Sequence, residues 1–295
     1  MSKALQRHCY DEIPACRVHH TSGYADGSVW IRQFHYDTDL VIDYFPQGRG
    51  EIRIEGRRYS FSAGDLILLS PSELHLCTIA EDTPFERITI HVSEELLYPF
   101  GTDHRDFFSA FYGRERGVGN LLRAERIKEY RLDRLLSEIL SCAKGEHPTD
   151  TVLLRCKTIE LLAAMGELVD EQAPSDESPR IENALILEIL QYLNAHYCEP
   201  LSLSDVAADF YHSKYHVCHL FREHVGISIH DYVTIRRIHL VNDKIRKGHS
   251  VADACYSAGF HNYSNFFRLY KKHTGLTPQQ FKQSLSEKQV PRRTP

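Results

Sequence analysis

The sequence contains no Cys-x-x-Cys pair, no long uncharged apolar run and no basic segment followed by an apolar one at its start. Its eight cysteines are scattered, which predicts reduced thiols rather than a disulfide framework or a zinc site. Without an apolar run of membrane-spanning length, we expect no signal peptide, no membrane partner and a cytoplasmic location. A phosphate-binding loop, a dinucleotide-binding glycine fingerprint and a nucleophile elbow are also missing, so we do not expect an enzyme.

Charge is distributed unevenly along the 295 residues, a length that suits two or three domains. The net charge of the chain is −5. Residues 1–180 carry 21 lysines and arginines against 30 aspartates and glutamates, whereas residues 181–295 carry 14 against 10. A positive C-terminal part suits contacts to phosphates, and an acidic N-terminal part should face away from nucleic acid. Ordinary scatter of charge is the alternative explanation.

The most informative feature is a helical unit that occurs twice within residues 201–282. In both copies, residues 213–226 and 262–275, a capping residue opens a helix with an apolar stripe, and a glycine closes it. The two closing glycines are 49 residues apart. A shorter helical segment precedes each copy, at 203–209 and 251–258. Two helices joined by a tight turn predict a helix-turn-helix, here present twice.

The second copy also carries a longer signature. Residues 250–278 read SVADACYSAGFHNYSNFFRLYKKHTGLTP, and this run resembles the signature of the AraC/XylS family of bacterial transcription regulators. The resemblance extends over about residues 181–284, with Val241 and Cys255 standing where the family usually has alanine. It implies two helix-turn-helix subdomains, joined by a long helix at 228–248, that bind double-stranded promoter DNA. A rigid joining helix would set the two recognition helices about one DNA turn, ~34 Å, apart.

The outer face of each recognition helix carries the residues that we expect at the DNA. These positions, together with two helix N-termini, form the predicted DNA-binding set: Lys214, Tyr215, Cys218, His219, Arg222, Ser228, Tyr263, Ser264, Phe267, Arg268, Lys271 and Thr277. Arg268 is the strongest candidate because arginine pairs bidentately with guanine. Ser228 and Thr277 would direct helix N-termini at phosphates. The alternative for Tyr263 and Phe267 is packing against a neighbouring helix.

The N-terminal half reads as short strands separated by turns. After a polar stretch at 1–14, which predicts a loosely held arm, strand-like segments occur at 29–35, 40–45, 51–55, 57–61, 66–69 and 86–92. This spacing predicts a small antiparallel barrel over about residues 16–95. Amphipathic segments at 121–143 and 150–169 predict two helices. In the resembling family the first of these commonly forms a dimer interface, which implies a homodimer; completing the domain core is the equal alternative.

The barrel segment resembles a cupin. His35 and Asp37 occupy two ligand positions of the first cupin motif, Val41 stands where that motif has a glutamate, and His75 ends the second motif. Losing the glutamate leaves at most three protein ligands of mixed type, so we expect no metal and no other cofactor. We expect instead a pocket for a small-molecule effector such as a sugar, lined by Trp30, Arg32, His35, Asp37, Tyr44 and His75. The alternatives are a metal-dependent cupin enzyme and histidines that only complete the barrel.

Together these features predict a multidomain α+β protein. A cupin-like β-barrel with flanking helices would occupy residues 1–172, and a polar, proline-containing linker residues 173–180. An all-α domain of two helix-turn-helix subdomains would occupy residues 181–286, followed by a disordered tail at 287–295. We expect a sequence-specific regulator, in particular an activator that responds to its effector and has RNA polymerase as a partner. A constitutive DNA-binding regulator without a ligand is the main alternative.

Overall fold

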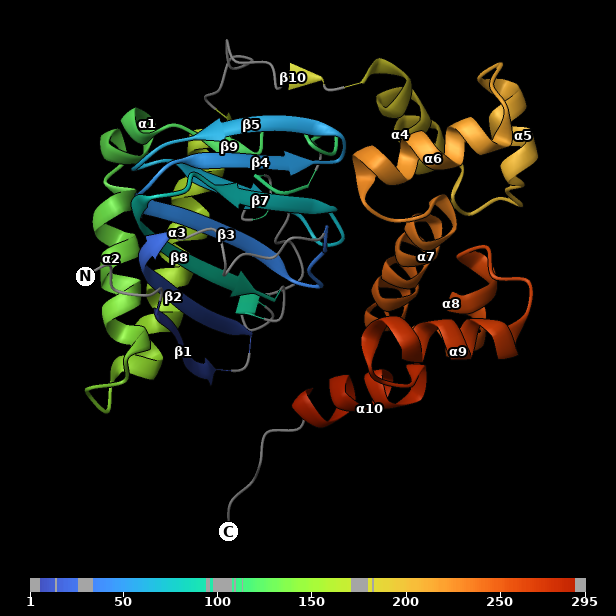
Figure 1. The fold of residues 1–295 in the computed structure, drawn as a ribbon. Coiled ribbons are helices and arrows are strands. Elements are labelled where there is room, and N and C mark those ends of the chain that lie inside the picture. Colours follow the sequence, from blue (N-terminus) through green and yellow to red (C-terminus); the bar gives the residue numbers. More distant parts are fainter. Residues whose placement is uncertain are drawn as a thin grey trace. The chain divides into compact units, whose positions relative to one another are not determined.

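The computed structural model describes residues 6–13, 15–25, 34–93, 96–97, 108, 110–112, 114–170, 180–181 and 183–289. The chain forms two compact units, Met1–Glu182 and Asn183–Pro295, and each is described by itself (Figure 1). The first unit is built on antiparallel strands and the second is helical, so the predicted fold class is confirmed. The predicted linker lies outside the described residues up to 179. Among the described helices, none is both long and apolar enough to cross a membrane.

The first unit contains two antiparallel sheets that face each other as a cupin-like barrel (Figure 1). The six-stranded sheet has the order β1-β2-β8-β3-β6-β9 and the four-stranded sheet the order β10-β5-β4-β7. The strands are β1 (Gln6–Ile13), β2 (Cys16–Ala25), β3 (Leu40–Gln47), β4 (Gly50–Ile54), β5 (Arg57–Phe61), β6 (Leu66–Leu69), β7 (His75–Ile79), β8 (Thr83–Val92), β9 (Leu121–Leu122) and β10 (Arg180–Ile181).

Two expectations about these strands need correction. The N-terminal stretch is no loose arm, because Gln6–Ile13 forms strand β1 and pairs antiparallel with β2. The strand expected at 29–35 lies mostly outside the described residues, and His35 forms only an isolated bridge with His75. The strands expected at 57–61 and 66–69 are confirmed with the same bounds.

Side chains alternate between two cores along the large sheet. On β3, Leu40, Ile42 and Tyr44 face a cluster shared with the helices, whereas Val41 and Phe45 belong to a second cluster between the two sheets. This alternation follows from the two-residue period of a strand. Because both faces of β3 are covered, its first six residues are all buried, and its sequence reads as a nearly continuous apolar run.

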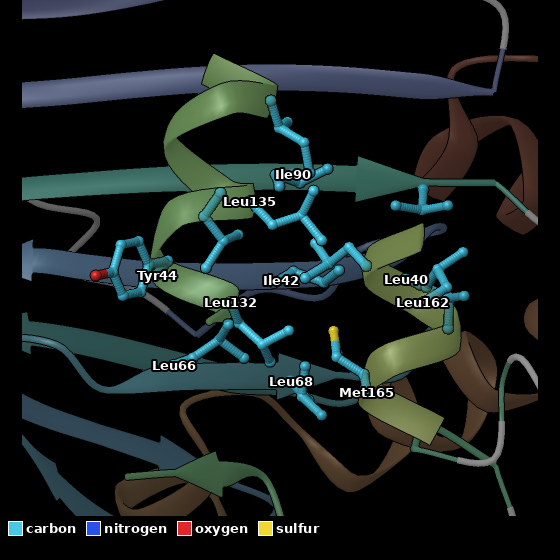
Figure 2. Close-up of a cluster of buried hydrophobic side chains, with 14 of the residues drawn as sticks. Leu40, Ile42, Tyr44, Leu66, Leu68, Ile90, Leu132, Leu135, Leu162 and Met165 are labelled. Atoms are coloured by element: carbon cyan, nitrogen blue, oxygen red, sulfur yellow. The ribbon is translucent and has the colours of Figure 1, made fainter. Parts of the chain in front are cut away.

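Three helices cover the outer face of the large sheet: α1 (Ala124–Glu129), α2 (Leu132–Ala143) and α3 (Asp150–Asp170). Figure 2 shows Leu132 and Leu135 of α2 and Leu162 and Met165 of α3 packed against the leucines and isoleucines of β3, β6 and β8. Full burial of each such side chain stabilises the fold by about 1.5–3 kcal/mol.

The prediction of a single helix at 121–143 is wrong. Leu121–Leu122 is a strand, and the helix breaks at Arg131, whose φ of 54° lies in the left-handed region. A helix cannot continue through a left-handed residue, so α1 and α2 are separate elements.

Within residues 183–289 the second unit forms seven helices: α4 (Ala184–His196), α5 (Leu203–Asp209), α6 (Lys214–Val225), α7 (Ile229–Arg246), α8 (Val251–Ser257), α9 (Tyr263–Thr274) and α10 (Pro278–Gln289). Their starts are fixed locally, because each of five capping side chains accepts a hydrogen bond from a backbone N–H of the first turn: Ser202, Ser213, Ser228, Ser250 and Asn262. Gly226 and Gly275 close α6 and α9 in the left-handed conformation, as predicted.

The ends of this unit differ from expectation. The all-α domain was expected to start at residue 181, but its first helix begins at Ala184, since Asn183 caps it and Ile181 pairs with β5 of the first unit. At the other end α10 continues to Gln289, so residues 287–289 of the expected tail are helical. Residues 290–295 lie outside the described part of the chain.

The two helix-turn-helix halves are joined tightly. Arg237 of α7 donates to the carbonyl oxygens of Tyr197 (2.6 Å) and Glu199 (2.7 Å), which follow α4, and its guanidinium lies over the ring of Phe260 in the second half. Gly259, with φ of 88°, brings the second turn so close to the Cys198 carbonyl that a Cβ there would overlap it. These contacts predict that the second unit behaves as one body.

The contact at Gly259 can be tested by substitution. Gly259→Ala should lower the free energy of unfolding by about 1–3 kcal/mol from overpacking, in addition to about 1–2 kcal/mol for a left-handed alanine. Gly248→Ala is the matched control, because Gly248 also has a positive φ (91°) but no heavy atom within 4 Å of an added Cβ. Urea unfolding followed by helical circular dichroism measures both. Equal losses in the two variants would show that the close approach is unimportant.

Candidate nucleic-acid interface and effector cavity

Helices α6 and α9 present comparable outer faces. Val217 and Phe221 of α6, and Phe266 and Tyr270 of α9, are buried in the unit's core. The predicted DNA-binding residues lie outside that stripe. Seven of them are exposed: Lys214, Tyr215, His219, Arg222, Ser264, Arg268 and Lys271. The other five are half-buried: Cys218, Ser228, Tyr263, Phe267 and Thr277.

Arg268 is exposed and held by its own helix. Its Nη2 donates to the Oδ1 of Asn265, one turn earlier, at 3.0 Å. Tyr263 is engaged differently, because its ring packs on Phe266 and its hydroxyl accepts from the Nε2 of Gln279 at 2.9 Å. This arrangement matches the packing alternative for Tyr263. Asn265 was missed in the sequence, although an amide at helical spacing from Arg268 could have pointed to it.

The two candidate phosphate-binding N-termini differ in charge. Ser228 caps α7 and donates to the Oδ2 of Asp231 at 2.7 Å, so a carboxylate already occupies the positive end of that helix. Thr277 caps α10 together with Gln280, which is neutral. The start of α10 therefore suits a phosphate better than the start of α7 does.

A polar cavity of about 140 Å³ lies between the two sheets of the first unit. Its walls come from β2, β3, β7, β8 and the segment 34–39. The lining residues are His19, Thr21, His35, Asp37, Val41, Asp43, His75, Cys77, Arg87, Thr89 and His91. Binding pockets for drug-sized molecules are usually about 300–1,000 Å³, so this cavity suits a smaller ligand.

Three of the six predicted effector residues line this cavity: His35, Asp37 and His75. The placement of Tyr44 is wrong, because it lies on the opposite face of β3 and packs in the cluster under α2 (Figure 2). Tyr44 is an odd number of positions from Val41 and therefore points to the other side of the strand. Trp30 and Arg32 lie outside the described residues.

Most of the cavity wall was missed in the sequence. Arg87, Thr89 and His91 are three inward-facing residues of β8, at alternate positions. Their spacing is a signal that could have been used, since polar residues at every second position mark one face of a strand. Asp43 and Thr89 are partners in the β3–β8 ladder, and the Thr89 hydroxyl donates to the Asp43 carboxylate.

Histidines surround the Asp37 carboxylate. Its Oδ2 is 3.6 Å from the Nε2 of His75, and its Oδ1 is 3.8 Å from the Nδ1 of His91. Burial raises the pKa of Asp37 and lowers the pKa of both His75 and His91, so all three shifts oppose charge. Burial also raises the pKa of the Cys77 thiol to about 12, which keeps it neutral and unreactive.

Glu73 stabilises the turn next to the cavity. Its carboxylate accepts from Arg114 Nη2 (2.7 Å), the backbone N–H of Ser70 (2.8 Å) and that of Gly117 (2.9 Å), and its own carbonyl lies 2.9 Å from the Nδ1 of His75. Burial alone would raise the pKa of Glu73, but the charges of Arg114 and Arg116 lower it to about 2. Glu73 therefore remains ionised and fixes the turn that carries His75.

Comparison with known proteins agrees with this arrangement. Residues 19–190 match the family model of the AraC-like ligand binding domain, and residues 206–284 match that of a helix-turn-helix domain. The chain therefore belongs to the AraC family of helix-turn-helix transcription regulators, which are not enzymes.

Individual relatives are distant. The HTH-type transcriptional regulator YdiP of Escherichia coli is 24% identical over 280 residues, which is 90% of this chain and 88% of YdiP. The arabinose operon regulatory protein of Escherichia coli is 23% identical over 257 residues, 84% of this chain and 82% of that protein. The crystal structure of ToxT from Vibrio cholerae aligns over 96% of this chain and 98% of its own, at 12% identity and a TM-score of 0.37.

The Glu73 network leads to a prediction about stability and pH. Glu73→Gln should lower the free energy of unfolding by about 3–5 kcal/mol at neutral pH, because it leaves buried arginine charge without its partner. Since the folded pKa of Glu73 (about 2) lies below its ordinary 4.5, the stabilisation is present above pH 4.5 and is lost as pH falls toward 2.

Denaturant midpoints at pH 7, 5.5, 4 and 3 check this expectation. The difference between wild type and Glu73→Gln should stay constant from pH 7 to 5.5 and shrink below pH 4.5. Glu115→Gln is the control, because Glu115 pairs with Arg57 with half of its side chain exposed and should cost at most about 1 kcal/mol. A wild-type advantage that is unchanged at pH 3 would contradict the depressed pKa.

Proposed function

We propose that this protein is a ligand-responsive regulator, acting mainly as an activator in the cytoplasm. In this proposal α6 and α9 enter successive major grooves of promoter DNA, and a small polar effector, in particular a sugar, occupies the cavity of the barrel. The observation that carries the proposal is the pair of exposed helix faces on one braced unit, together with a polar cavity in the other unit.

In this proposal α6 and α9 each supply residues that contact bases and residues that contact phosphates. Arg268 would pair with a guanine, and His219 occupies the corresponding place on α6 and could donate to guanine as well. Tyr215, Cys218 and Phe267 would contact bases through apolar surface, such as a thymine methyl group. Ser264 would contact a base edge. Phosphates would be bound by Lys214, Arg222 and Lys271 and by the helix start at Thr277, with the start at Ser228 as the weaker site.

The lining of the cavity supports a polyol. Asp43, Thr89 and Thr21 supply acceptors and hydroxyls, Arg87 supplies donors, and His19 can do either. A sugar presents donors and acceptors on adjacent carbons, which suits such a mixed wall better than an apolar ligand does. One relative is named as an arabinose operon regulator, and this name supports a sugar for the present protein by analogy. The effector would act by shifting the population of DNA-competent states.

Assembly and activation follow from the same proposal. The helical layer of α2 and α3 would supply a homodimer interface, since Val152 and Leu153 at the start of α3 are exposed apolar residues (62% and 42%). A bound dimer next to a promoter would then contact RNA polymerase. The constitutive alternative, in which the first unit only dimerises, predicts no response to any ligand.

Arg268 provides the direct test of DNA reading. Arg268→Ala should weaken binding to a site that the wild-type protein selects from a random DNA library by about 10–100-fold, equivalent to about 1–3 kcal/mol. Arg134→Ala removes an exposed arginine from α2 of the other unit and should leave binding unchanged. Fluorescence anisotropy of labelled DNA measures both. If Arg268→Ala bound the site with wild-type affinity, Arg268 of α9 would not contact the bases.

The cavity requires its own test. A thermal-shift screen of monosaccharides against the full chain should find a ligand that raises Tm, and Asp43→Asn should reduce that rise because the carboxylate no longer accepts two hydroxyls. Tyr44→Phe is the control, since Tyr44 faces the other core and should leave the response intact. A ligand response lost in Tyr44→Phe but kept in Asp43→Asn would place the site elsewhere.

A further inference from the structure

Three side chains in one corner of the cavity have the spacing of metal ligands. The ligand atoms of His35, Asp37 and His75 all lie within 4.8 Å of one another, and the His75 Nε2 is 3.6 Å from the Asp37 Oδ2. Two donors bound to one tetrahedral ion at about 2.0–2.1 Å lie ~3.4 Å apart. The His75–Asp37 pair is therefore close to the separation that a shared ion would impose.

The orientation of His75 is already fixed. Its Nδ1 lies 2.9 Å from the Glu73 carbonyl oxygen, which can only accept a hydrogen bond. The Nδ1 must then carry the hydrogen, and the Nε2 turns a lone pair toward Asp37. A metal-binding histidine typically has its other nitrogen held in this way, because the contact fixes both tautomer and ring orientation. His75 is buried, so no bulk water competes for this lone pair.

His91 compensates in part for the residue that the motif lacks. Val41 occupies the position where a cupin motif has a glutamate, and His91 is its direct partner in the β3–β8 ladder. The His91 Nδ1 lies 3.8 Å from the second oxygen of Asp37, which is beyond hydrogen-bond distance but within ion-pair range. Asp37 thus lies between two imidazoles, one oxygen facing each. This contact depends on strand pairing and is invisible in the linear motif.

The charge of the cavity favours a cation over an anion. Its wall contains two carboxylates, Asp37 and Asp43, against one guanidinium, Arg87, and four imidazoles. Imidazole nitrogens with a carboxylate oxygen are the donor set that zinc, cobalt and nickel ions prefer, whereas magnesium and calcium prefer oxygen alone.

We propose that this corner binds a divalent first-row transition-metal ion of the zinc, cobalt and nickel class. His35, Asp37 and His75 are its ligands, and His91 is a positioning residue whose imidazole faces the second oxygen of Asp37. The site goes beyond the proposed effector function. It uses one corner of the cavity and leaves Asp43, Arg87 and Thr89 for a polar effector.

Cobalt titration of the full chain tests the site. Protein treated with EDTA and then desalted should bind one equivalent of Co²⁺ and develop visible d–d absorption. His75→Ala should abolish the absorption, and Asp37→Asn, which keeps the shape of the side chain, should do the same. His91→Ala should weaken Co²⁺ binding by about 10–100-fold, as expected for a group that orients a ligand.

The control variant addresses adventitious binding. His212 lies just before α6 and His216 lies on its first turn; both are exposed with ring centroids 4.9 Å apart, and such a pair can bind Co²⁺ by itself. His216→Ala should leave the visible absorption unchanged. The proposal is overturned if wild-type protein takes up no Co²⁺ below millimolar concentration, if His75→Ala and Asp37→Asn bind as wild type does, or if His216→Ala removes the signal.

Two further readouts separate this proposal from the proposed function. Circular dichroism and binding to the selected DNA site, measured for every variant, report the fold and the regulator activity without metal. The sugar screen repeated on metal-free protein reports the effector site. A missing cobalt signal with intact DNA binding and sugar response would refute the metal site alone.

Discussion

The pairing of β3 with β8 is the constraint on which the N-terminal unit depends. In this ladder Asp43 lies opposite Thr89 and Val41 opposite His91, so the inward residues of the two strands line one cavity. Their neighbours Ile42 and Ile90 point outward into the core under the helices. A slip of one residue would exchange these faces, burying isoleucines in the cavity and charged groups under α2 and α3. The cavity and the helical cover are therefore specified by the same register.

Local signals predicted the second unit well. Each helix start there has a serine, threonine or asparagine whose side chain caps the first turn, and α6 and α9 end at glycines with positive φ. Such signals act within a few residues of the chain, so a sequence contains them in full. In the first unit, local signals did not predict the break between α1 and α2 at Arg131. A non-glycine residue in the left-handed region has no comparable sequence signature.

The cavity was predicted only in part because its wall is assembled from distant strands. His35 and His75 were found through a motif, whereas Asp43, Arg87 and His91 join them through the pairing of β3 with β8. Strand facing was the other obstacle. Tyr44 lies one residue beyond Asp43, and in a strand covered on both faces, hydrophobicity does not distinguish the two sides.

The bracing of the second unit limits how a signal can act. Arg237 binds the carbonyls of Tyr197 and Glu199 in one half and lies over Phe260 in the other, while Gly259 packs against Cys198 without room for a side chain. Breaking these contacts would leave the half-buried Arg237 guanidinium and the Tyr197 carbonyl without partners, which is costly. We therefore expect an effector to change the presentation of α6 and α9 together, as one rigid pair, rather than the spacing between them. If α6 and α9 read DNA as proposed, regulation would then lie in access to DNA and in assembly, and the spacing of the two recognition helices would be fixed by the chain.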